Sequence, residues 1–192
     1  MKKLLDVLFV RSDHVCPWWC CFTFDNPIRR LFHNPSRIVS PYIRQGNTVI
    51  DIGPGMGYFT GAMCKLVGKR GRVIAVDIQQ KMLDSLKKRV ARQGLADRLK
   101  TQLAGPNRFG VADKADFILA FWMVHEVPDK QEFFRQVAHL MKPAGRFLMA
   151  EPRLHVSKRA FSDTVHKAAG AGLKVRGNPS IAFSRTVLLS LA

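Results

Sequence analysis

Acidic residues are scarce in this chain of 192 residues, which has 14 aspartates and glutamates against 31 lysines and arginines and a formal net charge of +17. Such an imbalance suits an anionic partner, either a nucleic acid or a membrane surface. The positive charge is nevertheless spread along the whole chain, and its densest run, Lys87 to Arg89 with Arg92, lies on a predicted helix face. We interpret that run as a solvated face, with a nucleic-acid footprint as the alternative.

Long apolar runs are also missing. No run reaches the roughly 20 residues that a membrane-spanning helix needs, so we expect no membrane span. Residues 1–10 are basic and then apolar, but Asp6 interrupts them and Arg11 and Asp13 follow without a small-residue cleavage site. Four cysteines do not suggest a disulfide framework in a chain of this size. We therefore expect a cytoplasmic protein with reduced thiols.

No internal repeat, low-complexity tract or long linker divides the sequence. A chain of 192 residues with 47% hydrophobic residues can build one sizeable core but is too short for two ordinary domains. We expect a single domain, in which residues 1–46 form an N-terminal cap or arm of short helices and residues 47–192 form the core.

Glycine recurs at short intervals in the stretch from Thr48 to Thr60. A short apolar run there is followed by Gly53, Gly55 and Gly57, at every second position. The pattern predicts a buried strand, a sharp turn that lets the main chain approach a ligand, and a helix over residues 58–67. Such a unit is typical of a nucleotide cradle, although a purely structural turn gives the same spacing.

An acid follows the glycines at the distance that is typical of nucleotide-binding folds. Asp77 ends the next apolar strand, residues 72–77, twenty positions after Gly57. At that place a carboxylate can accept hydrogen bonds from both ribose hydroxyls of a nucleotide. Further strands are predicted within 97–103 and at 116–121, 146–150, 173–176 and 181–189, and helices at 81–93, 130–141 and 156–169. This alternation indicates an α/β fold with a parallel sheet.

At this point the chain resembles the class I S-adenosylmethionine-dependent methyltransferases, of the small methyltransferase-domain type, over roughly residues 36–192. Residues 49–57 are similar to the family's first motif, and residues 73–77 to its second. Residues 117–129 resemble the segment that follows the fourth strand. Residues 140–151 resemble the turn before the fifth strand, where Ala144 departs from the usual KPGG pattern.

The resemblance implies a Rossmann-like, mostly parallel sheet of six or seven strands, flanked by helices and preceded by a short helical cap. It implies S-adenosyl-L-methionine as cofactor and S-adenosyl-L-homocysteine as product. Many relatives also carry an acid after the third strand, and this chain has Asn107 in that loop instead. The implied cofactor-binding residues are Asp51, Gly53, Pro54, Gly55, Gly57, Asp77, Ile78, Gly105, Asn107 and Phe121.

A nicotinamide or flavin dinucleotide is the competing cofactor. Proteins that bind one usually show GxGxxG, and they hold its pyrophosphate at a helix N-terminus. Asp51, just before the glycines, would repel a pyrophosphate but suits a cationic sulfonium ligand.

His125 is the general-base candidate, because it follows the fourth strand at the edge where ligands of open α/β sheets bind. A histidine that only caps or packs the next turn is the alternative. Glu126 and Glu151 share that edge. Phe121, Trp122 and Met123, facing cap aromatics, would suit a small, partly apolar acceptor, although such residues also build cores. The predicted substrate pocket consists of Cys16, Trp18, Trp19, Phe24, Trp122 and Glu126.

Cys16, Cys20 and Cys21 have neither an iron–sulfur nor a paired zinc spacing, so we predict no resident metal. Together with His14 they could instead bind a metalloid such as arsenite, the alternative being buried or idle thiols. Cys64 is expected to pack in the core.

The predicted function is methyl transfer to a small molecule through a thiol, oxygen or metalloid acceptor. The alternative is an RNA-binding protein or RNA methyltransferase with the same fold, and it is not favoured because relatives that methylate nucleobase amino groups carry an Asn/Asp-Pro-Pro-aromatic element after the fourth strand. This chain has Ala120 to Met123 there. No oligomeric state follows from these patterns.

Overall fold

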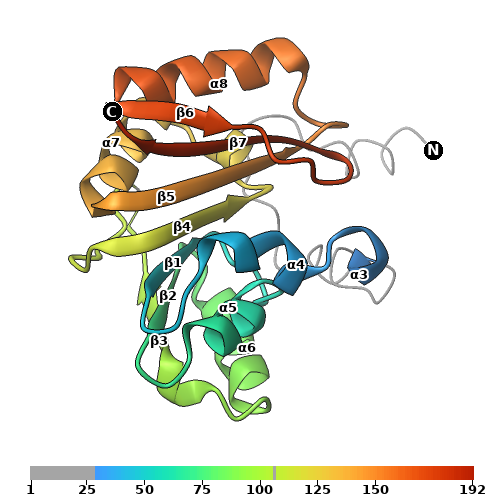
Figure 1. Ribbon diagram of the computed structural model, residues 1–192, viewed down its shortest axis with the longest axis vertical. Helices are drawn as coiled ribbons and strands as arrows, with labels where there is room; N and C mark the ends of the chain where they lie inside the picture. Colours follow the sequence, from blue (N-terminus) through green and yellow to red (C-terminus); the bar gives the residue numbers. More distant parts are fainter. Residues whose placement is uncertain (1–28, 106) are drawn as a thin grey trace.

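A computed structural model describes residues 29–105 and 107–192 of the chain. Its centre is a seven-stranded sheet with helices on both faces (Figure 1). The helices are α3 (Arg29–Phe32), α4 (Pro35–Val39), α5 (Thr60–Val67), α6 (Gln80–Ala91), α7 (Lys130–Leu140) and α8 (Lys158–Gly170), with short 3-10 turns η1 (Ser40–Tyr42), η2 (Ala96–Arg98) and η3 (Val124–Glu126). The strands are β1 (Thr48–Ile52), β2 (Arg72–Asp77), β3 (Leu99–Leu103), β4 (Ala115–Phe121), β5 (Met141–Pro152), β6 (Leu173–Gly177) and β7 (Ser184–Leu191).

The strand order is β3-β2-β1-β4-β5-β7-β6. Strands β1 to β5 pair in parallel, whereas β7 runs antiparallel to both of its neighbours, β5 and β6. The prediction of a mostly parallel, Rossmann-like sheet is therefore confirmed. Because the chain moves outward from β1 to β3 and then returns to β4, the order reverses between β1 and β4. Ligands of open α/β sheets bind at such a reversal, beyond the carboxyl ends of the strands.

The central strands are buried on both faces, which is why they form continuous apolar runs in the sequence. Val49, Phe117 and Leu119 face one core, which α5 and α6 cover. Ile50 and Ile118 face the other core, which α7 and α8 cover. Cys64 is completely buried in the first core, as expected.

Several predicted boundaries were wrong, and the physical reasons are local. The helix after the glycines begins at Thr60 rather than at residue 58. Strand β5 begins at Met141, well before residue 146, because Met141 pairs with Ala115 and the register then shifts before Phe117. Gly145 fits inside this irregular stretch, since a Cβ there would lie only 2.9 Å from the Lys142 carbonyl oxygen. Strand β7 begins three residues later than predicted, at Ser184.

Of the predicted cap, the structure describes α3, α4 and η1. Asn34 begins α4, because its side chain accepts a hydrogen bond from the Arg37 amide. Residues 14–24, with the predicted pocket members Cys16, Trp18, Trp19 and Phe24 and the thiols Cys20 and Cys21, lie outside the described residues. Among the helices that the structure does describe, none combines the length and the apolar character that crossing a membrane would require.

Candidate active site

Three loops meet where the strand order reverses. They follow β1 (residues 53–59), β2 (residues 78–79) and β4 (residues 122–129). The parallel register brings their starting points together, because Asp51 lies beside Leu119 and Ala75 in the neighbouring strands. The residues predicted from the first, second and fourth strands therefore share one edge of the sheet.

The glycine loop has a backbone that side chains rarely adopt. The φ angles of Gly53, Gly55 and Gly57 are +62°, +54° and +82°. A Cβ on Gly53 would approach Met123 Cγ to 2.9 Å, and one on Gly57 would approach Leu86 Cγ to 2.9 Å, so protein fills both places. At Gly55 no atom of the described residues, apart from the neighbours in the chain, lies within 4 Å of the added Cβ position. The loop is therefore packed at its two ends and open at its centre.

Asp51 lies inside the sheet beneath this loop. Its side chain accepts a hydrogen bond of 2.6 Å from the Thr60 hydroxyl, which ties β1 to the start of α5. Burial raises the pKa of Asp51 to about 7, against the lowering effect of that hydrogen bond. The carboxyl group thus supports the loop and holds its charge only weakly in the free protein.

Asp77 is nearly as buried, at the end of β2. It accepts a 2.9 Å hydrogen bond from the Gln79 amide, and the Gly55 and Ile78 backbones also stabilise its charge. Burial outweighs these bonds and raises the pKa of Asp77 to about 6, and the negative charge of Glu126 adds to the rise. The charge of Glu126 is therefore near enough to act on Asp77.

Beyond Asp77, two apolar side chains are open to solvent at this edge. Ile78 is 49% exposed and Leu103, at the end of β3, is 48% exposed. The loop that follows β3 turns back on itself through a Gly105–Arg108 bridge. The Asn107 carbonyl oxygen accepts a hydrogen bond of 2.8 Å from the Gln136 side chain of α7, which ties this loop to that helix.

His125 is held by Glu151, which sits at the end of the neighbouring strand β5. His125 Nδ1 lies 2.5 Å from a Glu151 carboxylate oxygen. The same carboxylate accepts hydrogen bonds from the Val124 amide (2.9 Å) and the His125 amide (3.2 Å). Glu151 is 1% exposed, so this carboxylate is a buried anchor for the whole turn.

The pairing sets both the charge and the tautomer of His125. Burial lowers the pKa of His125, but the hydrogen bond and charge of Glu151, with the charge of Glu126, outweigh it and raise the pKa overall. In the neutral ring, Nδ1 donates its proton to Glu151, because a carboxylate can only accept. Nε2 is then the basic nitrogen, and it points toward Glu126, 3.9 Å away.

An aromatic wall, made of Phe121 and Trp122, lies at the end of β4, where the loop that carries His125 begins. Trp122 has a positive φ of 60° and donates its indole N–H to the Ser184 hydroxyl at 2.9 Å. The Phe121 ring packs against Phe59, with centroids 4.4 Å apart. His33, from the cap, is wedged edge-on against both Phe121 and Trp122. The wall therefore joins the cap to the end of β4.

Three further residues at this edge could not be identified from the sequence. Thr60 carries no signal beyond its helix position. His33 is 2% exposed, and its Nε2 lies 2.6 Å from the Ala182 carbonyl oxygen, 149 positions away, so only the folded chain reveals it. Lys130 donates to the Val127 carbonyl oxygen, and burial lowers the pKa of Lys130.

A family model described as a methyltransferase domain matches residues 43–173, which is more than half of the chain and includes every loop described above. The chain belongs to this family. The chain therefore carries a methyltransferase domain of the type that uses S-adenosylmethionine as cofactor and releases S-adenosylhomocysteine.

The curated relatives of this methyltransferase include ubiquinone/menaquinone biosynthesis C-methyltransferases named UbiE. The one from Klebsiella pneumoniae is 31% identical over 110 residues, which cover 57% of this chain and 44% of the relative. The one from a Marinomonas species is 33% identical over 110 residues, with the same coverage of both chains. The matched part of this methyltransferase thus spans less than half the length of these relatives.

Solved structures show the same fold at lower identity. A methyltransferase from Aquifex aeolicus superposes with a TM-score of 0.84 at 20% identity, over 93% of this chain and all of that one. A putative rRNA methylase from Clostridium thermocellum gives 0.65 at 16%, over 82% and 93%. The mitomycin 7-O-methyltransferase MmcR gives 0.69 at 19%, over 100% and 67%.

The residues at the carboxyl edge fit S-adenosylmethionine. The open space over Gly55 leaves room for a ligand against the main chain. Within the two described ranges, no lysine or arginine forms an ion pair with Asp51 or Asp77, although burial disfavours the charge of both. A cationic ligand would stabilise the ionised form of these carboxylates, whereas a pyrophosphate would oppose it.

Proposed function

We propose that this methyltransferase acts on a small, partly apolar molecule whose accepting oxygen or carbon gives up a proton during transfer, with His125 as the general base. The observation that carries the proposal is the short contact between His125 Nδ1 and buried Glu151, 2.5 Å at the carboxyl edge of the sheet. Such a pair presents Nε2 as a base of fixed tautomer.

Cofactor binding is assigned to the neighbouring loops. The centre of the glycine loop (Gly53, Pro54, Gly55 and Gly57) would lie against the cofactor, and Asp77 would accept hydrogen bonds from its ribose. Ile78 would cover one face of the adenine ring, with Gly105 and Asn107 at its edge and Phe121 at the inner wall. Asp51 would support the loop from below through Thr60.

When bound, S-adenosylmethionine supplies a methyl group already activated by a sulfonium. The protein therefore has to align the acceptor, keep water out and take up the acceptor's proton. His125 Nε2 receives that proton, and buried Glu151 stabilises the imidazolium that results. Glu126, 3.9 Å from Nε2, adds to this stabilisation.

The acidity of the acceptor determines how much a positioned base contributes to its methylation. A thiol has a pKa of about 8.5 and ionises appreciably near neutral pH, whereas a phenol, at about 10, gains more from a positioned base. The aromatic wall of Phe121 and Trp122 suits a ring-bearing acceptor. Relatives named as C-methyltransferases of quinone biosynthesis, and a fold neighbour named as an O-methyltransferase, support carbon and oxygen acceptors.

The proposal is tested by a methyl-transfer screen that measures S-adenosylhomocysteine formation with phenols, enolisable carbon acids, thiols, amines, arsenite and RNA. We expect turnover of a phenol or a carbon acid, and a large loss of that turnover in His125→Asn with cofactor affinity retained. Transfer confined to thiols, arsenite or RNA, or turnover unaffected by His125→Asn, would overturn it.

A further inference from the structure

A concave site lies beside the glycine loop, between α4, α5 and α6. This cleft has a volume of about 270 Å³, and of the residues assigned to the cofactor only Gly57 lines it. Arg89 reaches from α6 to the Met56 carbonyl oxygen, which closes the cleft beside the glycine loop. Its lining is polar and basic and consists of Asn34, Pro35, Ser36, Gly57, Tyr58, Gly61, Ala62, Lys65, Arg89 and Gln93.

The surface around this cleft is strongly positive. Residues 29–98 contain fourteen lysines and arginines but only four acids, and two of those, Asp51 and Asp77, are buried. On α6 the one acid is Asp84, which accepts a hydrogen bond from Gln80. Within the described part of the chain, no carboxylate pairs with the basic residues Lys65, Lys88 or Arg92. No carboxylate among the described residues thus offsets the charge of these three side chains.

Basic residues also lie at the other end of α5. There another hollow, of about 340 Å³, is lined by Lys69, Arg70 and Arg98. Lys65 and Lys69 are four positions apart, and the eight residues of α5 extend over about 12 Å. Two basic hollows joined in this way suit an extended chain of negative charges better than a single small anion.

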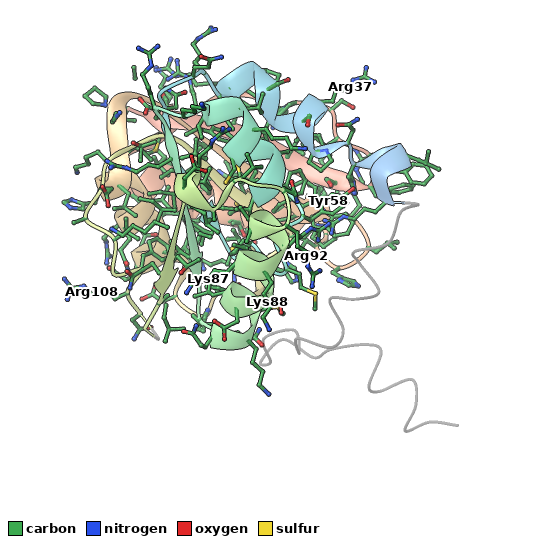
Figure 2. All side chains as sticks on the ribbon, turned by 90° about the horizontal axis from the view of Figure 1, so that it is seen from below. Arg37, Tyr58, Lys87, Lys88, Arg92 and Arg108 are labelled. Atoms are coloured by element: carbon green, nitrogen blue, oxygen red, sulfur yellow. The ribbon has the colours of Figure 1, made fainter. Side chains whose placement is uncertain are left out.

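Among the described residues, α4, α5 and α6 carry none of the exposed large apolar side chains that a membrane-binding surface needs. The exposed apolar residues nearest in sequence, Leu31 and Phe32, lie on α3. Figure 2 shows Arg37, Arg92 and Lys88 on the side of the molecule that carries Tyr58, Lys87 nearer the middle and Arg108 at the opposite edge. Charge without apolar side chains favours a phosphate backbone over a lipid surface.

We infer that this basic face, made of Arg37, Lys65, Lys87, Lys88, Arg89 and Arg92, binds the phosphate backbone of a single nucleic-acid strand, outside the methyl-transfer site. Recognition is electrostatic and independent of base sequence. Tyr58 does not offer its ring for base stacking, because its hydroxyl donates to the His33 carbonyl oxygen and the Arg29 guanidinium covers its ring at 4.3 Å. The inference concerns a partner and does not depend on the acceptor proposed above.

The test compares two matched triple variants of the full chain. The first neutralises Lys65, Lys88 and Arg92 to glutamine. The control neutralises Lys158, Arg159 and Lys174, also exposed, which lie on α8 and β6. Binding to a fluorescent RNA dodecamer of mixed sequence is measured by anisotropy between 50 and 200 mM salt, together with thermal unfolding and affinity for S-adenosylmethionine.

We expect wild type and control to bind RNA with a steep salt dependence. The first variant should lose more than about tenfold in affinity at low salt, and the slope of log affinity against log salt should fall by about 2, near 0.7 for each lost phosphate contact. Its unfolding temperature and cofactor affinity should stay at the control's values. Equal RNA binding by both variants, or binding to anionic vesicles but not to RNA, would overturn the inference.

Discussion

Replacing Glu151 by glutamine tests how the candidate base is held. The change keeps the shape of the side chain but removes its charge and one of its two acceptors. Glutamine then faces three donors, the Val124 amide, the His125 amide and His125 Nδ1, with a single oxygen. At least one buried donor loses its partner, so the free energy of unfolding should fall by about 1–3 kcal/mol.

The kinetic effect should be larger than the effect on stability. A positioned base contributes about 10²- to 10⁴-fold to a rate, and without Glu151 the tautomer and the orientation of His125 are lost. We expect kcat to fall by about 10²-fold or more, with little change in the affinity for S-adenosylmethionine. Glu132→Gln is the matched control, because Glu132 is a partly exposed carboxylate whose pairing with Arg135 contributes little.

The electrostatics of His125 predict how activity and stability change with pH. Glu151 helps to raise the pKa of His125 above its ordinary value of 6.5. The base acts when it is neutral, so wild-type activity should fall as the pH drops through this raised pKa, and the fall should move to lower pH in Glu151→Gln. The raised pKa also adds stability that is fully present below pH 6.5 and lost as the pH rises through the folded value. The stability difference between the two proteins should therefore be larger in acid.

A double-mutant cycle decides whether Glu151 acts through His125. If it does, Glu151→Gln should change kcat little once His125 is already asparagine. If the two changes lower kcat by independent factors that multiply, or if the pH profile of Glu151→Gln is unchanged, Glu151 does not act through His125.

Three further changes test the cofactor loops. Gly55→Ala should weaken S-adenosylmethionine binding, whereas Gly94→Ala, also at positive φ (+68°) with open space around the Cβ, should cost similar stability and leave binding intact; calorimetry and thermal unfolding separate the two. Asp77→Asn should lose about 10- to 100-fold in cofactor affinity. Because burial raises the pKa of Asp77 to about 6, the variant should unfold at higher temperature at neutral pH, and only wild-type binding should weaken below pH 6. Thr60→Val should lower the free energy of unfolding by about 1–3 kcal/mol, since Asp51 loses its hydrogen bond; unchanged denaturant unfolding would contradict this.

The fold and the glycine turn were predictable because their signals are local. A strand that is buried on both faces has an apolar run as its sequence. The glycines from Gly53 to Gly57 predict a turn, and they have positive φ angles. The partner of His125 was not predictable in the same way. Glu151 meets it only because β5 pairs with β4 in a register that sets Ala150 beside Phe121, and no spacing in the sequence reports that register.

The start of β5 was predicted wrongly for a related reason. The sequence around Pro143 and Gly145 is that of a turn, yet pairing of Met141 with Ala115 carries the strand through it. Tertiary pairing here overrides local preference. The expected cytoplasmic location stays a prediction. The thiol cluster at residues 16–21 likewise stays a prediction, because it lies outside the described residues.

The most direct test of the proposed base is the ratio of wild-type to His125→Asn rates across a series of phenolic acceptors that differ in acidity, measured at one pH. A base that removes the acceptor's proton matters only while that proton is present. The ratio should therefore be about 10² or more for acceptors that are protonated at the assay pH and should approach one for those already ionised. A ratio that stays constant across the series would show that His125 does not take the proton, and would contradict the account.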